Sequence, residues 1–184
     1  MIFAFIGPRG AGKSTITKRL ADLAGWPSLS TDELVVRSAG KPIAQIVAEE
    51  DWAGFRAREK KALAACLQEC ERIVKPGEGV FLDAGGGLIL DPENRATLRA
   101  AAQIVYLHAN PDVLAVRVRS ADEQRPALTD MGDAAAEMKR TFAERDPIYL
   151  ELADLEIDTD DMGVEGTVTI LLSWVMARCG VCQF

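Results

Sequence analysis

The chain has 184 residues, enough for one domain with a full hydrophobic core. Hydrophobic residues make up 48% of it and charged residues 27%, which is the composition of an ordinary globular protein. The net charge of −7 argues against a nucleic-acid partner, because such binding requires clustered Lys and Arg. The longest apolar stretch, residues 168–177, is too short to cross a bilayer, and no signal-peptide cleavage site follows the apolar start. We expect a cytoplasmic, monomeric protein with no nucleic-acid or membrane partner.

Short apolar runs that predict strands alternate along the chain with stretches that predict helices. The predicted strands are residues 2–6, 27–30, 79–84, 103–109 and 155–159. Helices are predicted over residues 14–24, 32–74 with a break at 39–42, 92–101, 111–119 and 163–178. Apolar strands that alternate with helices are typical of a parallel sheet covered on both faces. We therefore predict an α/β fold, a single domain over residues 1–184 with a five-stranded parallel sheet. The polar segment 120–137 predicts a mobile loop that leads into another helix.

The first predicted strand runs directly into the sequence IGPRGAGKST, residues 6–15. Gly7, Gly12, Lys13 and Ser14 match the phosphate-loop pattern G-x-x-x-x-G-K-[ST]. Glycines let backbone N–H groups turn toward phosphate oxygens, and the following helix adds the positive end of its dipole. Lys13 can bridge the β- and γ-phosphates of ATP, and the Ser14 hydroxyl can ligate Mg²⁺. The residues predicted to contact the nucleotide phosphates are Gly10, Ala11, Gly12, Lys13, Ser14 and Thr15.

Two stretches later in the chain carry groups that fit a phosphate acceptor. Arg56 and Glu59 lie three residues apart on a predicted helix, so they share a face. A guanidinium held by a carboxylate is oriented to bind an incoming anion, although a surface ion pair is the alternative interpretation. Gly85, Gly86 and Gly87 follow a buried strand, at the end of a parallel sheet where ligands bind. Their backbone N–H groups can approach a substrate closely, and the alternative is a tight turn.

Two further arginines lie in the last third of the chain. Arg125 falls in the predicted mobile loop, where a positive side chain on a closing flap can stabilise a transferring phosphoryl group. Arg145 stands near the predicted end of a helix, followed by Pro147 and Tyr149. It either binds the substrate or caps that helix end.

Taken in order, these motifs resemble the shikimate kinase family over the full length of the chain. That family combines a phosphate loop, an Asp-x-Asp motif, F-R-x-x-E on a helix, G-G-G after a strand, R-P in a lid and R-x-P-L-Y on a later helix. The corresponding segments here are residues 7–15, Ser30-Thr31-Asp32, Phe55-Arg56-x-x-Glu59, Gly85–Gly87, Arg125-Pro126 and Arg145-Asp146-Pro147-Ile148-Tyr149. The resemblance implies a phosphate-loop kinase fold, an acceptor-binding helical segment at about 32–62 and a lid at about 119–133. It also implies transfer of the ATP γ-phosphate to the 3-hydroxyl of shikimate.

For the acceptor side, the resemblance implies a role for each matching residue. Arg56 and Arg145 would hold the shikimate carboxylate. The backbone of Gly85, Gly86 and Gly87 would flank the ring. Asp32 would bind ring hydroxyls and could take the proton of the attacked hydroxyl as general base.

For the donor side, the resemblance implies that Lys13 and Mg²⁺ neutralise charge that develops in phosphoryl transfer. Arg125 would swing in over the phosphates. An arginine that precedes the lid would stack on adenine, and both Arg117 and Arg119 fit that place.

The chain departs from the family pattern in the Asp-x-Asp motif, because Ser30 replaces the first Asp. In the family that carboxylate helps to hold the water shell of the magnesium ion. We hypothesise that Asp83, at the end of a predicted strand, contacts Mg²⁺ through water in its place, with Ser14 as the other metal-site residue. The alternative is that Asp83 caps the glycine turn that follows it.

Three other functions are compatible with the phosphate loop. Another small-molecule kinase, such as one acting on gluconate, would share the loop and a lid, but is not expected to combine F-R-x-x-E with R-x-P-Φ-Y, where Φ is apolar. A nucleoside monophosphate kinase would require more arginines, because its acceptor is itself a phosphate. A non-catalytic nucleotide-binding module is supported only by Ser30, and binding alone would not require the whole residue set.

Overall fold

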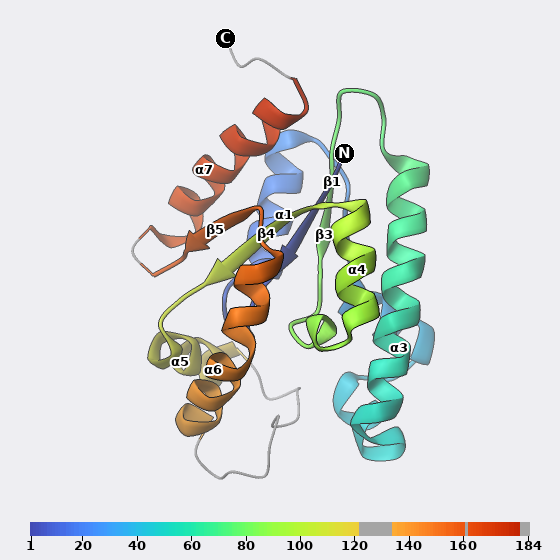
Figure 1. Ribbon diagram of the computed structural model, residues 1–184, viewed down its shortest axis with the longest axis vertical. Coiled ribbons are helices and arrows are strands. Elements are labelled where there is room, and N and C mark those ends of the chain that lie inside the picture. Colours follow the sequence, from blue (N-terminus) through green and yellow to red (C-terminus); the bar gives the residue numbers. More distant parts are fainter. Residues whose placement is uncertain (122–133, 161, 181–184) are drawn as a thin grey trace.

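The computed structural model describes residues 1–121, 134–160 and 162–180, with a five-stranded sheet at its centre (Figure 1). All strands are parallel and lie in the order β2-β3-β1-β4-β5. Their bounds are β1 Ile2–Ile6, β2 Ser28–Ser30, β3 Val80–Asp83, β4 Gln103–His108 and β5 Leu155–Asp158. Each predicted strand is confirmed to within one residue at either end, because the apolar runs are sharply bounded by polar residues, Gly or Pro.

The helices of the described residues lie between these strands in the chain, except α7, which follows β5. Their bounds are α1 Lys13–Ala24, α2 Thr31–Ala39, α3 Ile43–Ile73, α4 Pro92–Ala101, α5 Pro111–Ala121, α6 Ala134–Leu152 and α7 Gly163–Arg178, with a 3₁₀ turn η1 at Leu88–Leu90. The predicted break at 39–42 is confirmed, because Gly40 ends α2 in the left-handed region with a φ of 67°. Asp91 caps α4 as its position before Pro92 indicates, accepting a hydrogen bond from the amide of Glu93 at 2.8 Å.

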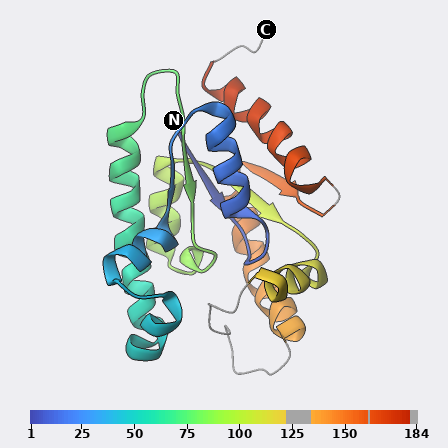
Figure 2. The same ribbon diagram turned by 180° about the vertical axis from the view of Figure 1, so that it is seen from behind.

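The sheet is covered on both faces, as predicted. Leu63, Leu98 and Tyr149 bring α3, α4 and α6 onto one face, and Figure 1 shows this layer in front of the sheet. Ile16 and Leu171 bring α1 and α7 onto the other face, which Figure 2 turns toward the viewer. Alternate side chains of each strand enter the two cores, so strands buried on both faces are apolar almost throughout.

A third, smaller apolar cluster lies within the predicted acceptor-binding segment. Val35, Ile43, Ile46, Phe55 and Ala62 pack α2 against α3, away from the two cores of the sheet. The blue to cyan ribbon of this segment lies against the lower part of α3 in Figure 1. The residues that hold the acceptor segment together are therefore largely separate from those that hold the sheet.

Both ends of the loop predicted at 120–137 are helical. Residues 119–121 continue α5 and residues 134–137 begin α6, while the rest of the predicted lid, Arg125 included, lies outside the described residues. Met138 packs into the core with α1 and α7, and this burial stabilises a helix although the residues around it are largely polar.

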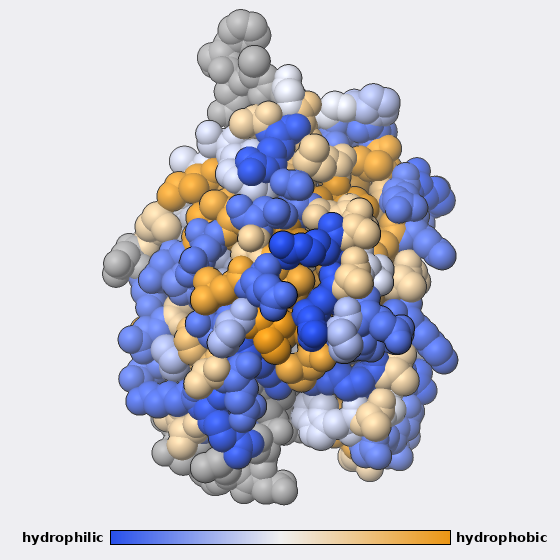
Figure 3. All heavy atoms as spheres, in the orientation of Figure 1, coloured by the Kyte–Doolittle hydropathy of each residue, from blue (hydrophilic) through white to orange (hydrophobic). Residues whose placement is uncertain are grey.

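The face that carries α3, α4 and α6 mixes hydrophilic and hydrophobic residues (Figure 3). Within the described ranges, every helix is too short or too polar to cross a bilayer.

Candidate active site

The phosphate loop joins β1 to α1 and opens onto a cavity of about 440 Å³. Gly7 has a φ of 144°, and a Cβ at this position would collide with the carbonyl oxygen of Leu107. Lys13 Nζ donates hydrogen bonds to the carbonyl oxygens of Gly7 and Pro8, at 2.9 and 3.0 Å, so its ammonium group lies over the loop. The cavity is lined by Arg9, Gly10, Ala11, Gly12, Lys13, Ser14, Thr15, Ile16, Arg117, Thr159, Gly163, Val164 and Thr167.

Arg117 forms part of the wall of this nucleotide cavity. Its Nη1 and Nη2 donate to the hydroxyl and the carbonyl oxygen of Thr159, each at 2.9 Å. Because Thr159 is only 4% exposed, the guanidinium is fixed rather than extended into solvent. Of the two arginines that the sequence leaves open for adenine, Arg117 reaches the cavity, and the side chain of Arg119 lies outside the described residues.

Asp83 lies beside the phosphate loop at the end of β3. Ser14 Oγ donates a hydrogen bond to Asp83 Oδ2 at 2.5 Å. Ser30 is the residue paired with Asp83 across the β2–β3 ladder, and its hydroxyl caps α2 by accepting from the amide of Glu33 at 3.3 Å. The carboxylate absent at residue 30 is therefore matched by one on the neighbouring strand. Asp83 thus contacts the serine of the phosphate loop, and its two predicted roles, at the metal site and as a cap of the glycine turn, both stay predictions.

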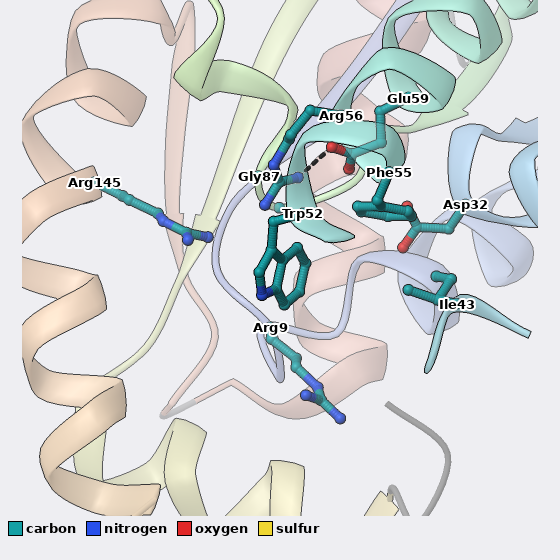
Figure 4. Close-up of a pocket in the computed structure, with 10 residues that line it drawn as sticks. Arg9, Asp32, Ile43, Trp52, Phe55, Arg56, Glu59, Gly87 and Arg145 are labelled. Carbon is teal, nitrogen blue, oxygen red and sulfur yellow. Dashed lines mark hydrogen bonds and ion pairs between the residues drawn. The ribbon is translucent and has the colours of Figure 1, made fainter. Parts of the chain in front are cut away.

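The predicted acceptor residues line a second cavity, shown in Figure 4. Arg56 reaches this cavity from α3, and Arg145 reaches it from α6 on the opposite side. Asp32 lies on a third side, at the start of α2. The lining residues are Arg9, Asp32, Ile43, Trp52, Phe55, Arg56, Glu59, Gly86, Gly87 and Arg145. Two arginines that are far apart in the sequence thus converge on one small space, as the motifs predict.

Arg56 is held by a buried carboxylate rather than by a surface ion pair. Its Nη1 bonds to Glu59 Oε2, and the Glu59 side chain is only 2% exposed. Burial raises the pKa of Glu59 to about 7, while the neighbouring Arg56 opposes this shift. The Arg56 guanidinium also lies 5.4 Å from the ring centroids of Trp52 and of Phe55, within cation–π range. These contacts fix the direction of the guanidinium toward the cavity.

The glycine turn after β3 makes room for the acceptor side chains. A Cβ at Gly87 would collide with the Arg56 guanidinium, and one at Gly85 would lie 2.5 Å from Asp32 Oδ1 and 2.9 Å from Glu59 Oε1. Gly86 and Gly87 line the cavity, whereas Gly85 is not among its lining residues. Gly85 and Gly87 therefore allow the close approach of these side chains, whereas none of the three glycines has the positive φ for which the turn itself would require glycine.

The sequence predicts that Arg145 lies near the end of a helix, and this prediction is wrong. The helix α6 continues through Pro147 to Leu152, about two turns beyond Arg145, so capping of the helix end is excluded as its role. Tyr149, one turn further along α6, is buried and its hydroxyl donates to the carbonyl oxygen of Gly86 at 2.5 Å. This bond ties the helix that carries Arg145 to the glycine turn.

Three residues of the acceptor cavity, Arg9, Ile43 and Trp52, were not predicted from the sequence. Arg9 lines both cavities and so lies where donor and acceptor would meet. It occupies a variable position of the loop motif, so the pattern gives no signal for it. Trp52 precedes Arg56 by four residues, and this spacing on a helix could have placed both on one face.

Comparisons with known proteins identify the family of this chain. The family model described as shikimate kinase matches residues 9–175. Shikimate kinase 2 of Sodalis glossinidius (strain morsitans) is 39% identical over 155 residues, which are 83% of each chain. The shikimate kinase of Rhodopirellula baltica is 36% identical over 95% of this chain and 90% of its own.

A solved structure of shikimate kinase from Acinetobacter baumannii in complex with shikimate superposes with a TM-score of 0.84. It is 28% identical and covers 96% of this chain and 93% of its own. A gluconokinase from Sinorhizobium meliloti 1021 is less similar, with a TM-score of 0.52 and 20% identity, and this likeness shows the fold alone. The match over most of the chain and the identity of its relatives place this chain in the shikimate kinase family.

Proposed function

We propose that this chain transfers the γ-phosphate of ATP to the 3-hydroxyl of shikimate. The observation that carries the proposal is the convergence of Arg56 and Arg145 on one cavity beside the phosphate loop. Two guanidinium groups that face a small cavity suit a single organic anion such as a ring carboxylate. Arg9 lines this cavity and the nucleotide cavity alike, so an acceptor held by the arginines would lie next to the ATP phosphates.

Asp32 is the group proposed to receive the hydroxyl proton. It lines the acceptor cavity, in which Glu59 is a carboxylate partner of Arg56. A carboxylate that accepts a hydrogen bond from the attacked hydroxyl orients its oxygen and takes its proton as the phosphoryl group arrives. Gly86 and Gly87 expose backbone beside the same space, which leaves room for the ring.

On the donor side, residues 10–15 and Lys13 are proposed to hold the phosphates, and Arg117 is proposed to stack on adenine. Lys13 would exchange its loop carbonyl partners for the β- and γ-phosphate oxygens. Arg119 and Arg125 belong to the proposed lid at about 119–133, where Arg125 would cover the phosphates during transfer. Removal of water by such a lid strengthens each charge interaction in the site.

The residues beside the phosphate loop fit a magnesium ion. A hydroxyl and a carboxylate, those of Ser14 and Asp83, lie 2.5 Å apart at the edge of the nucleotide cavity, and oxygen ligands suit Mg²⁺. We propose that Ser14 ligates the ion and that Asp83 contacts it through water, in place of the family carboxylate that Ser30 lacks. When bound, Mg²⁺ supplies positive charge to the phosphate oxygens. Phosphate-loop enzymes commonly use this pair of residue types for that purpose.

We also propose that the described elements belong to a single kinase domain that acts as a monomer in the cytoplasm. A net charge of −7 supports a small-molecule substrate over nucleic acid. The separate core of α2 and α3 is proposed to be an acceptor-binding part of that domain, spanning about 32–62.

The test is ADP release with a panel of acceptors: shikimate, quinate, gluconate and nucleoside monophosphates. We expect ATP-dependent turnover with shikimate and background rates with the others. Turnover with gluconate alone would support the alternative function of a gluconate kinase, which is compatible with the same fold. ATP binding without turnover of any acceptor would support a non-catalytic module.

A further inference from the structure

The long helix α3 is interrupted once, at Asp51. This residue has a φ of 59° and a ψ of −176°, whereas the residues on both sides are helical. Among the described residues other than glycine, Asp51 is the single one with a positive φ. That combination of angles is occupied almost only by glycine, because a Cβ crowds the backbone there. The chain therefore maintains a strained conformation at this point with a residue that disfavours it.

The side chain of Asp51 starts the second half of α3. Its Oδ1 accepts hydrogen bonds from the amides of Ala53 and Gly54, at 2.7 and 3.0 Å. These amides lie in the first turn after the interruption and have no helical carbonyl partner of their own. Asp51 thus acts as an N-cap inside a continuous segment, and it fixes where the second helix begins.

The residues that follow this cap are those of the acceptor cavity. Trp52, Phe55, Arg56 and Glu59 all line it, and all lie on the part of α3 that directly follows Asp51. Their direction into the cavity depends on the rotation of the second helix about its axis. That rotation is set at the residue where the helix starts, because each later residue follows at a fixed angle.

Two further contacts hold the interruption closed. Glu50 accepts hydrogen bonds from Arg58 at 2.7 and 2.9 Å and pairs with Lys41 at 3.2 Å, so it ties the two halves of α3 together. Gly54 lies directly against Glu50, and a Cβ on Gly54 would approach the Cβ of Glu50 to 2.6 Å. The fold of the chain at this point is thus defined by several contacts rather than by the Asp51 backbone alone.

We propose that Asp51 is a positioning residue for the acceptor, an inference that rests on the proposed function. In this role Asp51 acts through the helix that it caps and does not itself touch the substrate. Its carboxylate cap and its strained backbone hold the second half of α3 at the rotation that directs Arg56 and Trp52 into the cavity. Without the cap, the first turn of the second helix can shift or fray. The side chains of Arg56 and Trp52 then adopt several orientations, and fewer of them suit the acceptor.

The chain offers a matched control for this role. Asp91 caps α4 in the same way, through a 2.8 Å bond from the Glu93 amide, but it has ordinary backbone angles and lies outside both cavities. Removal of either cap lowers stability by a similar amount. Only the cap at residue 51 is expected to alter acceptor binding.

The experiment compares KM for shikimate, KM for ATP, kcat and the thermal midpoint in D51A, D51N, D51G, G54A and D91A. We expect D51A to raise KM for shikimate about five- to tenfold, the equivalent of one lost cap, with KM for ATP within about twofold of wild type. D51N retains an oxygen that can cap the helix and a side chain that tolerates positive φ, so it stays close to wild type. D51G relieves the backbone strain but lacks the cap, so its KM for shikimate rises although its thermal midpoint exceeds that of D51A.

G54A tests the same geometry from the other side of the interruption, and it should raise KM for shikimate selectively as well. D91A should lower the thermal midpoint and leave both KM values unchanged. An unchanged KM for shikimate in D51A and D51G, or equal rises for shikimate and ATP, would overturn the positioning role. Failure of the proposed function would show separately, as absence of shikimate turnover in the wild-type protein.

Discussion

Ser14 Oγ donates a hydrogen bond to Asp83 Oδ2 at 2.5 Å and so joins the first turn of α1 to the end of β3. Ser30, the position at which the family has a carboxylate, pairs with Asp83 in the β2–β3 ladder. A carboxylate on either strand therefore lies at the same edge of the sheet, beside the phosphate loop. This register underlies the proposal that Asp83 takes the place, at a magnesium site, of the carboxylate that the family has at position 30.

If Asp83 supports magnesium, D83N should raise the Mg²⁺ concentration needed for half-maximal activity by about 10- to 100-fold, as outer-shell substitutions do. KM for shikimate should stay within about twofold, because Asp83 is not among the residues that line the acceptor cavity. A magnesium titration at saturating ATP and shikimate measures the effect. The double variant S30D/D83N carries the carboxylate on β2 instead of β3, and it should recover most of the apparent Mg²⁺ affinity that D83N loses. An unaltered titration in D83N would assign Asp83 to the glycine turn alone.

Removal of Arg56 should weaken acceptor binding more than removal of an exposed arginine. Arg56→Ala leaves the buried Glu59 without its partner, and we expect a loss of roughly 2–5 kcal/mol in shikimate binding. Arg72 provides the control, because it forms the same i,i+3 pair with Glu69 on α3 but its side chain is 70% exposed. R72A should leave KM for shikimate unchanged. Similar KM values in R56A and wild type would remove Arg56 from the carboxylate site.

Glu59 should make the protein less stable as the pH rises toward neutrality. Its pKa is raised from 4.5 to about 7 in the folded state, so the folded state binds more protons than the unfolded chain between these values. Stability from this group is complete below about pH 4.5 and declines as the pH rises through 7, by about 3 kcal/mol at most. Glu59→Gln should flatten this dependence, measured by urea unfolding from pH 5 to 8. If E59Q and wild type decline in parallel, Glu59 titrates normally.

Arg117 should serve the nucleotide and not the acceptor. R117A should raise KM for ATP about tenfold, the scale of one favourable cation–π contact, without a change in KM for shikimate. Steady-state kinetics with each substrate varied in turn separates the two values. R119A is the comparison, and we expect its KM for ATP within about twofold of wild type. The reverse ranking would assign adenine stacking to Arg119.

The sheet and the convergence of the two arginines could be predicted from the sequence because both follow from local signals. Apolar strands with sharp polar or glycine boundaries define the sheet, and Arg56 and Arg145 belong to motifs that are recognised by spacing. Asp51 could not be predicted in the same way. An aspartate within a helical stretch gives no indication of glycine-like backbone angles, which depend on the contacts of Glu50 and Gly54.

Two other features required the three-dimensional contacts. Arg9 occupies a position in the loop motif that accepts many residues, so its place between two cavities follows only from the path of the loop. The space that Gly87 leaves for the Arg56 guanidinium is likewise a contact between distant segments. The length of α6 could not be predicted because a proline such as Pro147 usually ends a helix, whereas here Tyr149, two residues later, is buried in the core.

The most direct measurement compares the binding of shikimate with that of its carboxamide analogue, by calorimetry, in wild type, R56A and R145A. If both guanidinium groups hold one carboxylate, each variant should bind shikimate at least about tenfold more weakly, yet bind the uncharged carboxamide within about threefold of wild type. Equal losses for both ligands, or a loss in one arginine variant alone, would contradict a shared carboxylate site.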